Sequence, residues 1–174
     1  MLHRKLEFAM PAPSAVVFDA FHFHAWRHQW DSLVSATAVQ TGEPCPYKGA
    51  ITESTGGGWK RGLSMRTEFV AFDRPHMAAA SMLGTSFPFT RWAASMRHRD
   101  LPAGQSLLVY TYTFDVGPAW ATWLLEPVVG FFFLQQTHKR FARLSRFLAH
   151  HATAVAHWQS AREIELGRPS HDSA

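Results

Sequence analysis

The stretch SLLVYTYTFDV, residues 106–116, is the most regular part of the sequence. Large apolar side chains alternate with polar ones, which is the pattern of a strand with one buried face and one solvated face. The predicted buried face consists of Leu108, Tyr110, Tyr112 and Phe114. Gly117 and Pro118 follow and end the strand.

A long helical pattern comes next, from about Trp120 to Ile164. Apolar residues recur three, four or seven positions apart, which predicts one continuous helix face. The predicted inner face consists of Leu124, Val128, Phe131, Leu134, His138, Phe141, Leu144, Leu148 and Val155. A basic stripe is predicted on the opposite, solvated face: Lys139, Arg140, Arg143 and Arg146. Such a stripe could make weak contact with an anionic membrane surface or an acidic partner.

The chain before residue 106 contains further strand-like stretches and two short helical ones. The predicted strands are residues 2–10, 36–41, 48–55, 63–72, 76–83 and 89–98. Two short helices, residues 15–23 and 25–33, follow the first strand after a Pro-containing turn. This order predicts an α+β fold with a curved antiparallel sheet wrapped around the C-terminal helix. We expect one domain over residues 1–166 and a loose tail over 167–174.

Composition places this chain among folded proteins. Hydrophobic residues make up 47% and charged residues 17% of its 174 residues, which is unlike a disordered chain. Aromatic residues reach 14%, so these rings must either pack tightly or line a cavity. Cys45 is the only cysteine, which excludes an internal disulfide and a cysteine-based zinc site.

The location of the protein is expected to be cytoplasmic. Residues 1–7 lack the apolar core of a signal peptide. The most apolar stretch, around residues 119–134, is interrupted by Glu126 and Pro127 and is too short to span a bilayer. The net charge of +4 is mostly spread along the chain, so we do not expect nucleic acid as a partner.

Several short stretches resemble the START/Bet v 1-like superfamily, also called SRPBCC, and its polyketide cyclase/dehydrase branch. They are PSAVVFDA at residues 13–20, Trp30 before Asp31, FVAFDRP at residues 69–75, and the strand and helix after residue 106. The resemblance covers roughly residues 1–150. It implies the helix-grip fold, with a deep apolar cavity under the long helix. Family members include lipid carriers, hormone receptors and aromatase/cyclases, so fold does not decide function.

The inward faces converge on one interior, where we expect a ligand cavity. The predicted ligand-binding residues are Met65, Phe69, Trp92, Met96, Tyr110, Tyr112, Phe131 and Leu134. The tyrosine hydroxyls could orient the polar end of a ligand. The expected ligand is a small hydrophobic molecule such as a lipid, a quinone or a polyketide-like aromatic. The alternative is an ordinary packed core in an interaction module.

Acid–base chemistry has three candidates: Glu53, His98 and His138. Each is predicted to point inward, where a dry pocket shifts pKa values toward those needed for proton transfer. They would suit a cyclase or dehydratase that uses the same pocket. The alternative is that each is a hydrogen-bonded structural residue.

A metal ion is not expected, and neither is a cofactor. The densest group of possible metal ligands is His22, His24, His28 and Asp31. Its spacing does not match a recognised metal motif. Phosphate-binding loops, Rossmann glycine patterns and nucleophile elbows do not occur in the sequence either.

Overall fold

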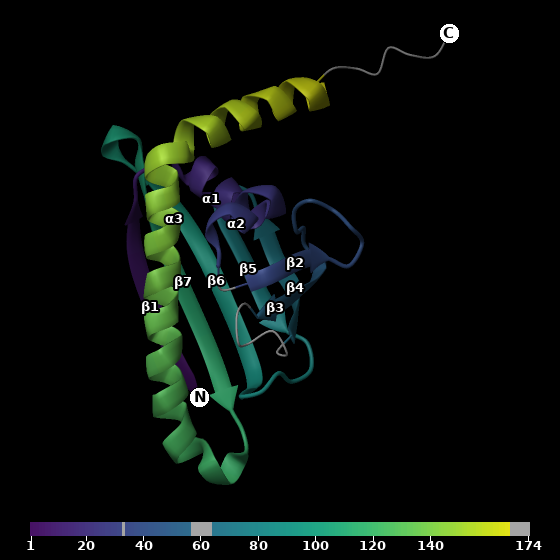
Figure 1. Cartoon of the computed structure of the whole chain (residues 1–174), viewed down its shortest axis with the longest axis vertical. Coiled ribbons are helices and arrows are strands. Elements are labelled where there is room, and N and C mark those ends of the chain that lie inside the picture. Colours follow the sequence, from purple (N-terminus) through teal and green to yellow (C-terminus); the bar gives the residue numbers. More distant parts are fainter. Residues whose placement is uncertain (33, 57–63, 168–174) are drawn as a thin grey trace.

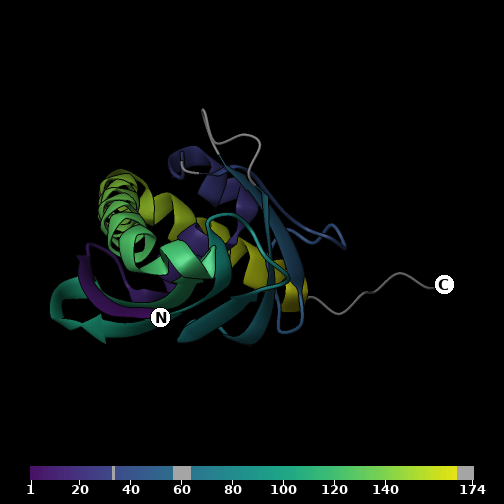
Figure 2. The same cartoon turned by 90° about the horizontal axis from the view of Figure 1, so that it is seen from below.

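Seven strands form one antiparallel sheet in the order β1-β7-β6-β5-β4-β3-β2 (Figure 1). The structure is a computed structural model that describes residues 1–32, 34–56 and 64–167. The strands are β1 (Leu2–Met10), β2 (Val34–Val39), β3 (Ile51–Gly56), β4 (Ser64–Asp73), β5 (Met77–Met82), β6 (Phe89–Leu101) and β7 (Gln105–Val116). Register shifts in β2, β4 and β6 mark bulges, which bend a sheet. The sheet curves around the helices (Figure 2).

Three α-helices lie on the concave side of this sheet. Helices α1 (Ser14–His22) and α2 (His24–Trp30) follow β1, and α3 (Thr122–Gly167) follows β7. The 3-10 turns η2 (Pro102–Gly104) and η3 (Ala119–Ala121) precede β7 and α3, respectively. The predicted α+β fold, with two short helices after the first strand, is confirmed. The expected tail over 167–174 lies outside the described residues, except for Gly167 at the end of α3.

Helix α3 lies along β1 and β7 and then bends to pass over α1 (Figure 1). Gln159, beyond the bend, donates hydrogen bonds to the Ala15 carbonyl at 3.0 Å and to Asp19 Oδ2 at 2.6 Å. In the described part of the chain, none of the helices has an apolar stretch long enough to cross a membrane.

The stretches behind the family resemblance meet in space. The buried carboxylate of Asp19 in α1 pairs with Arg74 in the turn after β4, with Arg74 Nε 2.7 Å from Asp19 Oδ1. Trp30 ends α2, and its Nε1 donates to the Ala20 carbonyl at 2.9 Å. These contacts hold α1 and α2 against each other and against one end of the sheet.

The predicted buried face of β7 is confirmed, because Leu108, Tyr110, Tyr112 and Phe114 are all buried. Phe141 of α3 packs against it, with its ring centroid 5.2 Å from that of Tyr110 and 4.6 Å from that of Phe8. Leu144, Leu148 and Val155 of α3 are also buried. The second half of the predicted helix face is therefore correct.

The first half of that face is wrong. Leu124, Val128 and His138 are exposed, and Phe131 is 58% exposed. The inward residues are instead Gly130, Phe133 and Thr137. A Cβ on Gly130 would lie 2.6 Å from Leu2 Cδ1, so the helix lies close to the Leu2 side chain of β1 at this glycine. The rotation of α3 agrees with its fully buried residues Phe141, Leu144 and Leu148, whereas apolar spacing alone did not identify it because residues 131–133 are all phenylalanine.

We expect Phe141→Ala to lower the free energy of unfolding by about 3–5 kcal/mol, since Phe141 is 1% exposed and its removal leaves a cavity. Phe131→Ala is expected to change it by no more than about 0.5 kcal/mol. Denaturant unfolding of both variants measures the difference. Equal losses for the two would contradict the rotation of α3 described above.

Candidate functional site

A cavity of about 300 Å³, partly open to solvent, lies between the sheet and the three helices. Its lining residues, called the cavity wall below, come from strands β3 to β7 and from α1, α2 and α3. The apolar part of the wall consists of Phe21, Met65, Phe69, Ala78, Ala80, Trp92, Ala94, Met96 and Phe133. The polar part consists of His22, Arg27, Thr52, Ser54, Thr67, Tyr110 and Arg140.

Five of the eight predicted ligand-binding residues lie in the cavity wall: Met65, Phe69, Trp92, Met96 and Tyr110. The other three lie elsewhere. Tyr112 is buried in the core, with its ring centroid 4.7 Å from that of Phe133. Phe131 is exposed and Leu134 is half-buried, because the rotation of α3 places Phe133 at the wall in their stead.

The polar part of the wall contains an ion cluster built on Asp31, at the end of α2. Arg27 Nε donates to Asp31 Oδ2 at 3.0 Å. Arg140, from α3, donates to the same oxygen through Nε at 3.1 Å and Nη2 at 2.6 Å. Both guanidinium groups also lie over the Phe21 ring, each 4.9 Å from its centroid, in cation–π geometry.

Burial dominates the electrostatics of this cluster. It lowers the pKa of Arg27 to about 10, which still leaves the guanidinium charged at neutral pH. Burial also opposes ionisation of Asp31, but the two guanidinium groups outweigh it and hold the pKa of Asp31 below its usual value. The cluster therefore carries two positive charges and one negative charge.

The sequence pattern did not reveal this cluster. It predicted Arg140 on a solvated stripe and Asp31 in a group with three histidines. The placement of Arg140 is wrong, because the side chain turns into the cavity wall and is only 19% exposed. One sequence signal could have shown half of the cluster, since Arg27 and Asp31 are four residues apart on a helix, the spacing of an ion pair.

His22 is the imidazole in the cavity wall. Its Nδ1 lies 2.9 Å from the Phe18 carbonyl oxygen, which can only accept, so Nδ1 carries the hydrogen. Burial lowers the pKa of His22 well below its ordinary value. The ring is therefore neutral at physiological pH, and its Nε2 is a hydrogen-bond acceptor.

The other members of the possible metal group, His24, His28 and Asp31, do not converge on one point with His22. The rings of His24 and His28 lie 6.4 Å apart, and Asp31 binds the two arginines. Among the described residues, no three His, Cys, Asp or Glu side chains come together as a metal-binding group.

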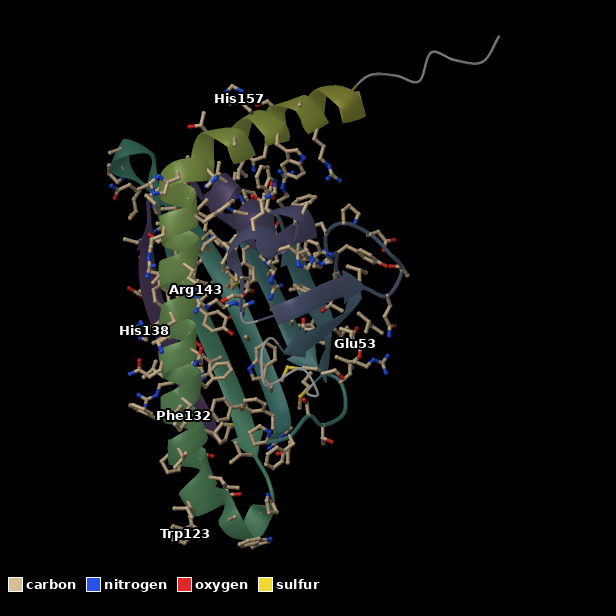
Figure 3. All side chains as sticks on the ribbon, viewed as in Figure 1. Glu53, Trp123, Phe132, His138, Arg143 and His157 are labelled. Carbon is tan, nitrogen blue, oxygen red and sulfur yellow. The ribbon has the colours of Figure 1, made fainter. Side chains whose placement is uncertain are left out.

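The three candidates for acid–base chemistry do not meet. Glu53 and His138 are exposed, on opposite sides of the molecule (Figure 3). The expectation that Glu53 points inward is wrong, because Thr52 and Ser54 of β3 take the inner positions and strand neighbours alternate. His138 is exposed at the edge of α3, where its ring centroid lies 5.4 Å from that of Phe8, and it is not in the cavity wall. His98 is buried on the inner face of β6, against Phe18.

The comparisons with known proteins agree with this architecture. The model of one family, described as polyketide cyclase / dehydrase and lipid transport, matches residues 1–148. The chain belongs to this family. None of the curated protein sequences gives a match.

Several solved structures share this fold. The chain is similar to the crystal structure of Ara h 8.0201, with a TM-score of 0.67 and 14% identity, covering 85% of this chain and 97% of that one. A START superfamily protein from Mycobacterium smegmatis has a TM-score of 0.64 and 12% identity over 84% and 98% of the two chains. Norcoclaurine synthase from Thalictrum has a TM-score of 0.61 and 13% identity over 86% and 95%. At these identities the likeness shows the fold alone.

Stability should depend on pH through His98. Burial lowers the pKa of His98 to about 4, whereas a histidine in the unfolded chain titrates near 6.5. Between these values the unfolded chain binds the proton more readily. The contribution is therefore complete above about pH 6.5 and is lost as the pH falls toward 4.

We expect about 1–2 kcal/mol to be lost through His98 between pH 7 and pH 5. In His98→Phe the free energy of unfolding should change less steeply with pH. Some dependence should remain, because the buried His22 contributes in the same direction. The exposed His157 is the matched control (Figure 3). An unchanged slope in His98→Phe, or an equal change in His157→Gln, would contradict this assignment.

Proposed function

We propose that this protein binds a small hydrophobic molecule, such as a lipid, a quinone or a polyketide-like aromatic, in the cavity between the sheet and the helices. One observation carries the proposal: a wall of aromatic, aliphatic and methionine side chains surrounds about 300 Å³. This is the lower end of the usual volume of ligand pockets. Membership of a family described by polyketide and lipid chemistry supports the same conclusion.

The size of the cavity limits the ligand. At about 300 Å³ the cavity lies at the lower end of the range for ligand pockets, so it suits a small ligand. A medium-length acyl chain or a two-ring aromatic fits this limit, whereas a full phospholipid would have to leave much of itself outside.

A cyclase or dehydratase acting in the same cavity is the second candidate function. It is supported by His22, a neutral imidazole in the cavity wall with one acceptor nitrogen. Glu53 and His138 do not support it, since both are exposed. We favour binding without chemistry because the cavity wall is mostly apolar, whereas only one of the possible acid–base groups, His22, lies in it.

A cavity-filling pair of variants tests the proposal. Ala94 and Ala93 are neighbours in β6, but Ala94 lies in the cavity wall and Ala93 is exposed on the other face. We expect Ala94→Phe to occupy the cavity and weaken binding of an apolar fluorescent probe at least about tenfold, or 1.4 kcal/mol. Ala93→Phe should leave probe binding unchanged. Equal binding by both variants would mean that the probe does not enter this cavity.

We also propose that the protein contacts a membrane surface through one apolar end of the molecule. The proposed surface, called the aromatic end, consists of large exposed side chains from the loop before β6, from η3 and from the first turns of α3: Phe87, Trp120, Trp123, Leu124, Val128, Phe131 and Phe132. Trp120 and Trp123 are 81% and 78% exposed. Figure 3 shows Trp123 at one tip of the molecule, near the start of α3.

The composition of this surface favours a lipid bilayer with anionic lipids as its partner. Tryptophan is enriched where proteins meet the membrane interface. Further along α3, Lys139 and Arg146 are exposed and add positive charge, as in surface-bound amphipathic helices. A carrier of apolar molecules also needs a place to exchange them with a membrane.

We expect the double variant Trp120→Ala/Trp123→Ala to bind vesicles of phosphatidylcholine and phosphatidylserine at least about tenfold more weakly. Each substitution removes apolar surface that the tryptophan would bury in the membrane. Vesicle co-sedimentation measures this, and Tyr47→Ala, at an exposed ring elsewhere, is the control. Absence of vesicle binding, together with a concentration-dependent dimer that the double variant abolishes, would instead identify a second copy of the chain as the partner.

A further inference from the structure

We infer that the ligand is an acid, with an apolar body and one carboxylate end that Arg27 and Arg140 hold inside the cavity. The inference rests on the proposed binding function and names the chemical class of the ligand. It is carried by the ion cluster in the cavity wall and by the position of that cluster relative to the apolar part of the wall.

The charge of the cluster is unbalanced. Two guanidinium groups surround one carboxylate, Asp31, and all three side chains are mostly removed from solvent, with exposures of 13%, 19% and 1% for Arg27, Arg140 and Asp31. Among the described residues of the cavity wall, the other titratable groups do not supply a second negative charge. His22 is neutral, and burial raises the pKa of Tyr110 to about 12, which keeps its hydroxyl protonated. A net positive charge in a poorly solvated place is unfavourable unless an anion joins it.

The hydrogen-bond donors of the cluster also point to an anion. A guanidinium carries five N–H donors. The bonds to Asp31 use one from Arg27 and two from Arg140. Both arginines lie in the cavity wall, so further donors are available to a ligand there. Guanidinium groups bind carboxylates well because their planar donors match the two oxygens.

The arginines are held ready for a ligand. Asp31 fixes both of them from α2, and the Phe21 ring packs against both. An arginine that is already ordered loses less conformational entropy when it binds. This arrangement differs from a flexible surface arginine, which would have to be ordered at the moment of binding.

The geometry also predicts the length of the ligand. Arg140 and Phe133 are both in the cavity wall and lie seven residues apart on α3, which corresponds to roughly 10 Å along the helix. Phe133 packs on Phe114, which is the strand neighbour of Trp92. The cavity therefore runs from the cationic cluster at Arg140 to the apolar wall near Phe133 and Trp92. An extended acid of about eight carbons spans this distance.

The test compares octanoate with 1-octanol, which have the same chain length but differ in charge. At pH 7.5 we expect octanoate to bind the unmodified protein at least tenfold more tightly than octanol in isothermal titration calorimetry. Octylammonium is expected to bind more weakly than octanol, because its charge has the same sign as the cluster. This comparison needs no variant, so it stays valid even if a substitution in the cluster prevents folding.

Variants then assign the preference to the cluster. Arg140→Gln leaves Asp31 paired with Arg27, and it should bring the ratio of octanol to octanoate dissociation constants close to one. Lys139→Gln removes the same charge from the adjacent exposed position and should leave the ratio unchanged. Equal affinity for octanoate and octanol in the unmodified protein would overturn the inference while leaving the binding function intact. If neither compound binds and an apolar probe also fails to bind, the proposed function fails with it.

Discussion

The close contact between α3 and the first and last strands is the constraint on which the rest of the structure depends. Gly130 allows α3 to approach β1, and Phe141 packs between Phe8 of β1 and Tyr110 of β7. This contact seats the first part of the helix over one edge of the sheet. The inner faces of β3 to β6 consequently meet side chains of α1 and α2 and a few from α3, and the space left among them is the cavity.

Two buried carboxylates, Asp19 and Asp31, connect the helices to their neighbours. They differ in the number of guanidinium groups that each one binds. Asp19 in α1 receives the guanidinium of Arg74 and the amide of Gln159, so one full positive charge meets its negative charge. Asp31 receives two guanidinium groups. Asp19 joins α1 to the sheet and to the end of α3 and lies outside the residues found in the cavity wall. Asp31 holds its two arginines in that wall, and their excess positive charge would attract the proposed anionic ligand.

The sequence predicted the elements well and the orientation of some of them poorly. The alternation in β7 is unambiguous, because every second residue from Leu108 to Phe114 is large and apolar. Residues 131–133 are three phenylalanines, which can supply an apolar face in several rotations, and packing against the sheet selects the rotation that buries Phe141 and Leu144. In β3 the inward residues are Thr52 and Ser54, so polarity gave no sign of which face is buried.

The ion cluster was harder still to predict, since Arg140 has the same chemistry as its solvated neighbours on α3. Its role depends on Asp31, which is 109 residues away in the chain. A single sequence reveals local spacing, such as that of Arg27 and Asp31, but it does not reveal contacts between residues that are far apart in the chain. The site therefore emerges only when α2 and α3 are placed together by the core.

The protonation states in the cavity wall fit the proposed binding function. A proton-transfer group works best when its pKa lies near the operating pH. Among the described wall residues, burial lowers the pKa of His22 well below that range and raises the pKa of Tyr110 to about 12. Arg27 keeps its charge at neutral pH, with a pKa of about 10. None of these three groups changes its protonation state near neutral pH. A wall with a fixed acceptor at His22 and fixed cations at one end fits the proposed binding of an acidic apolar molecule.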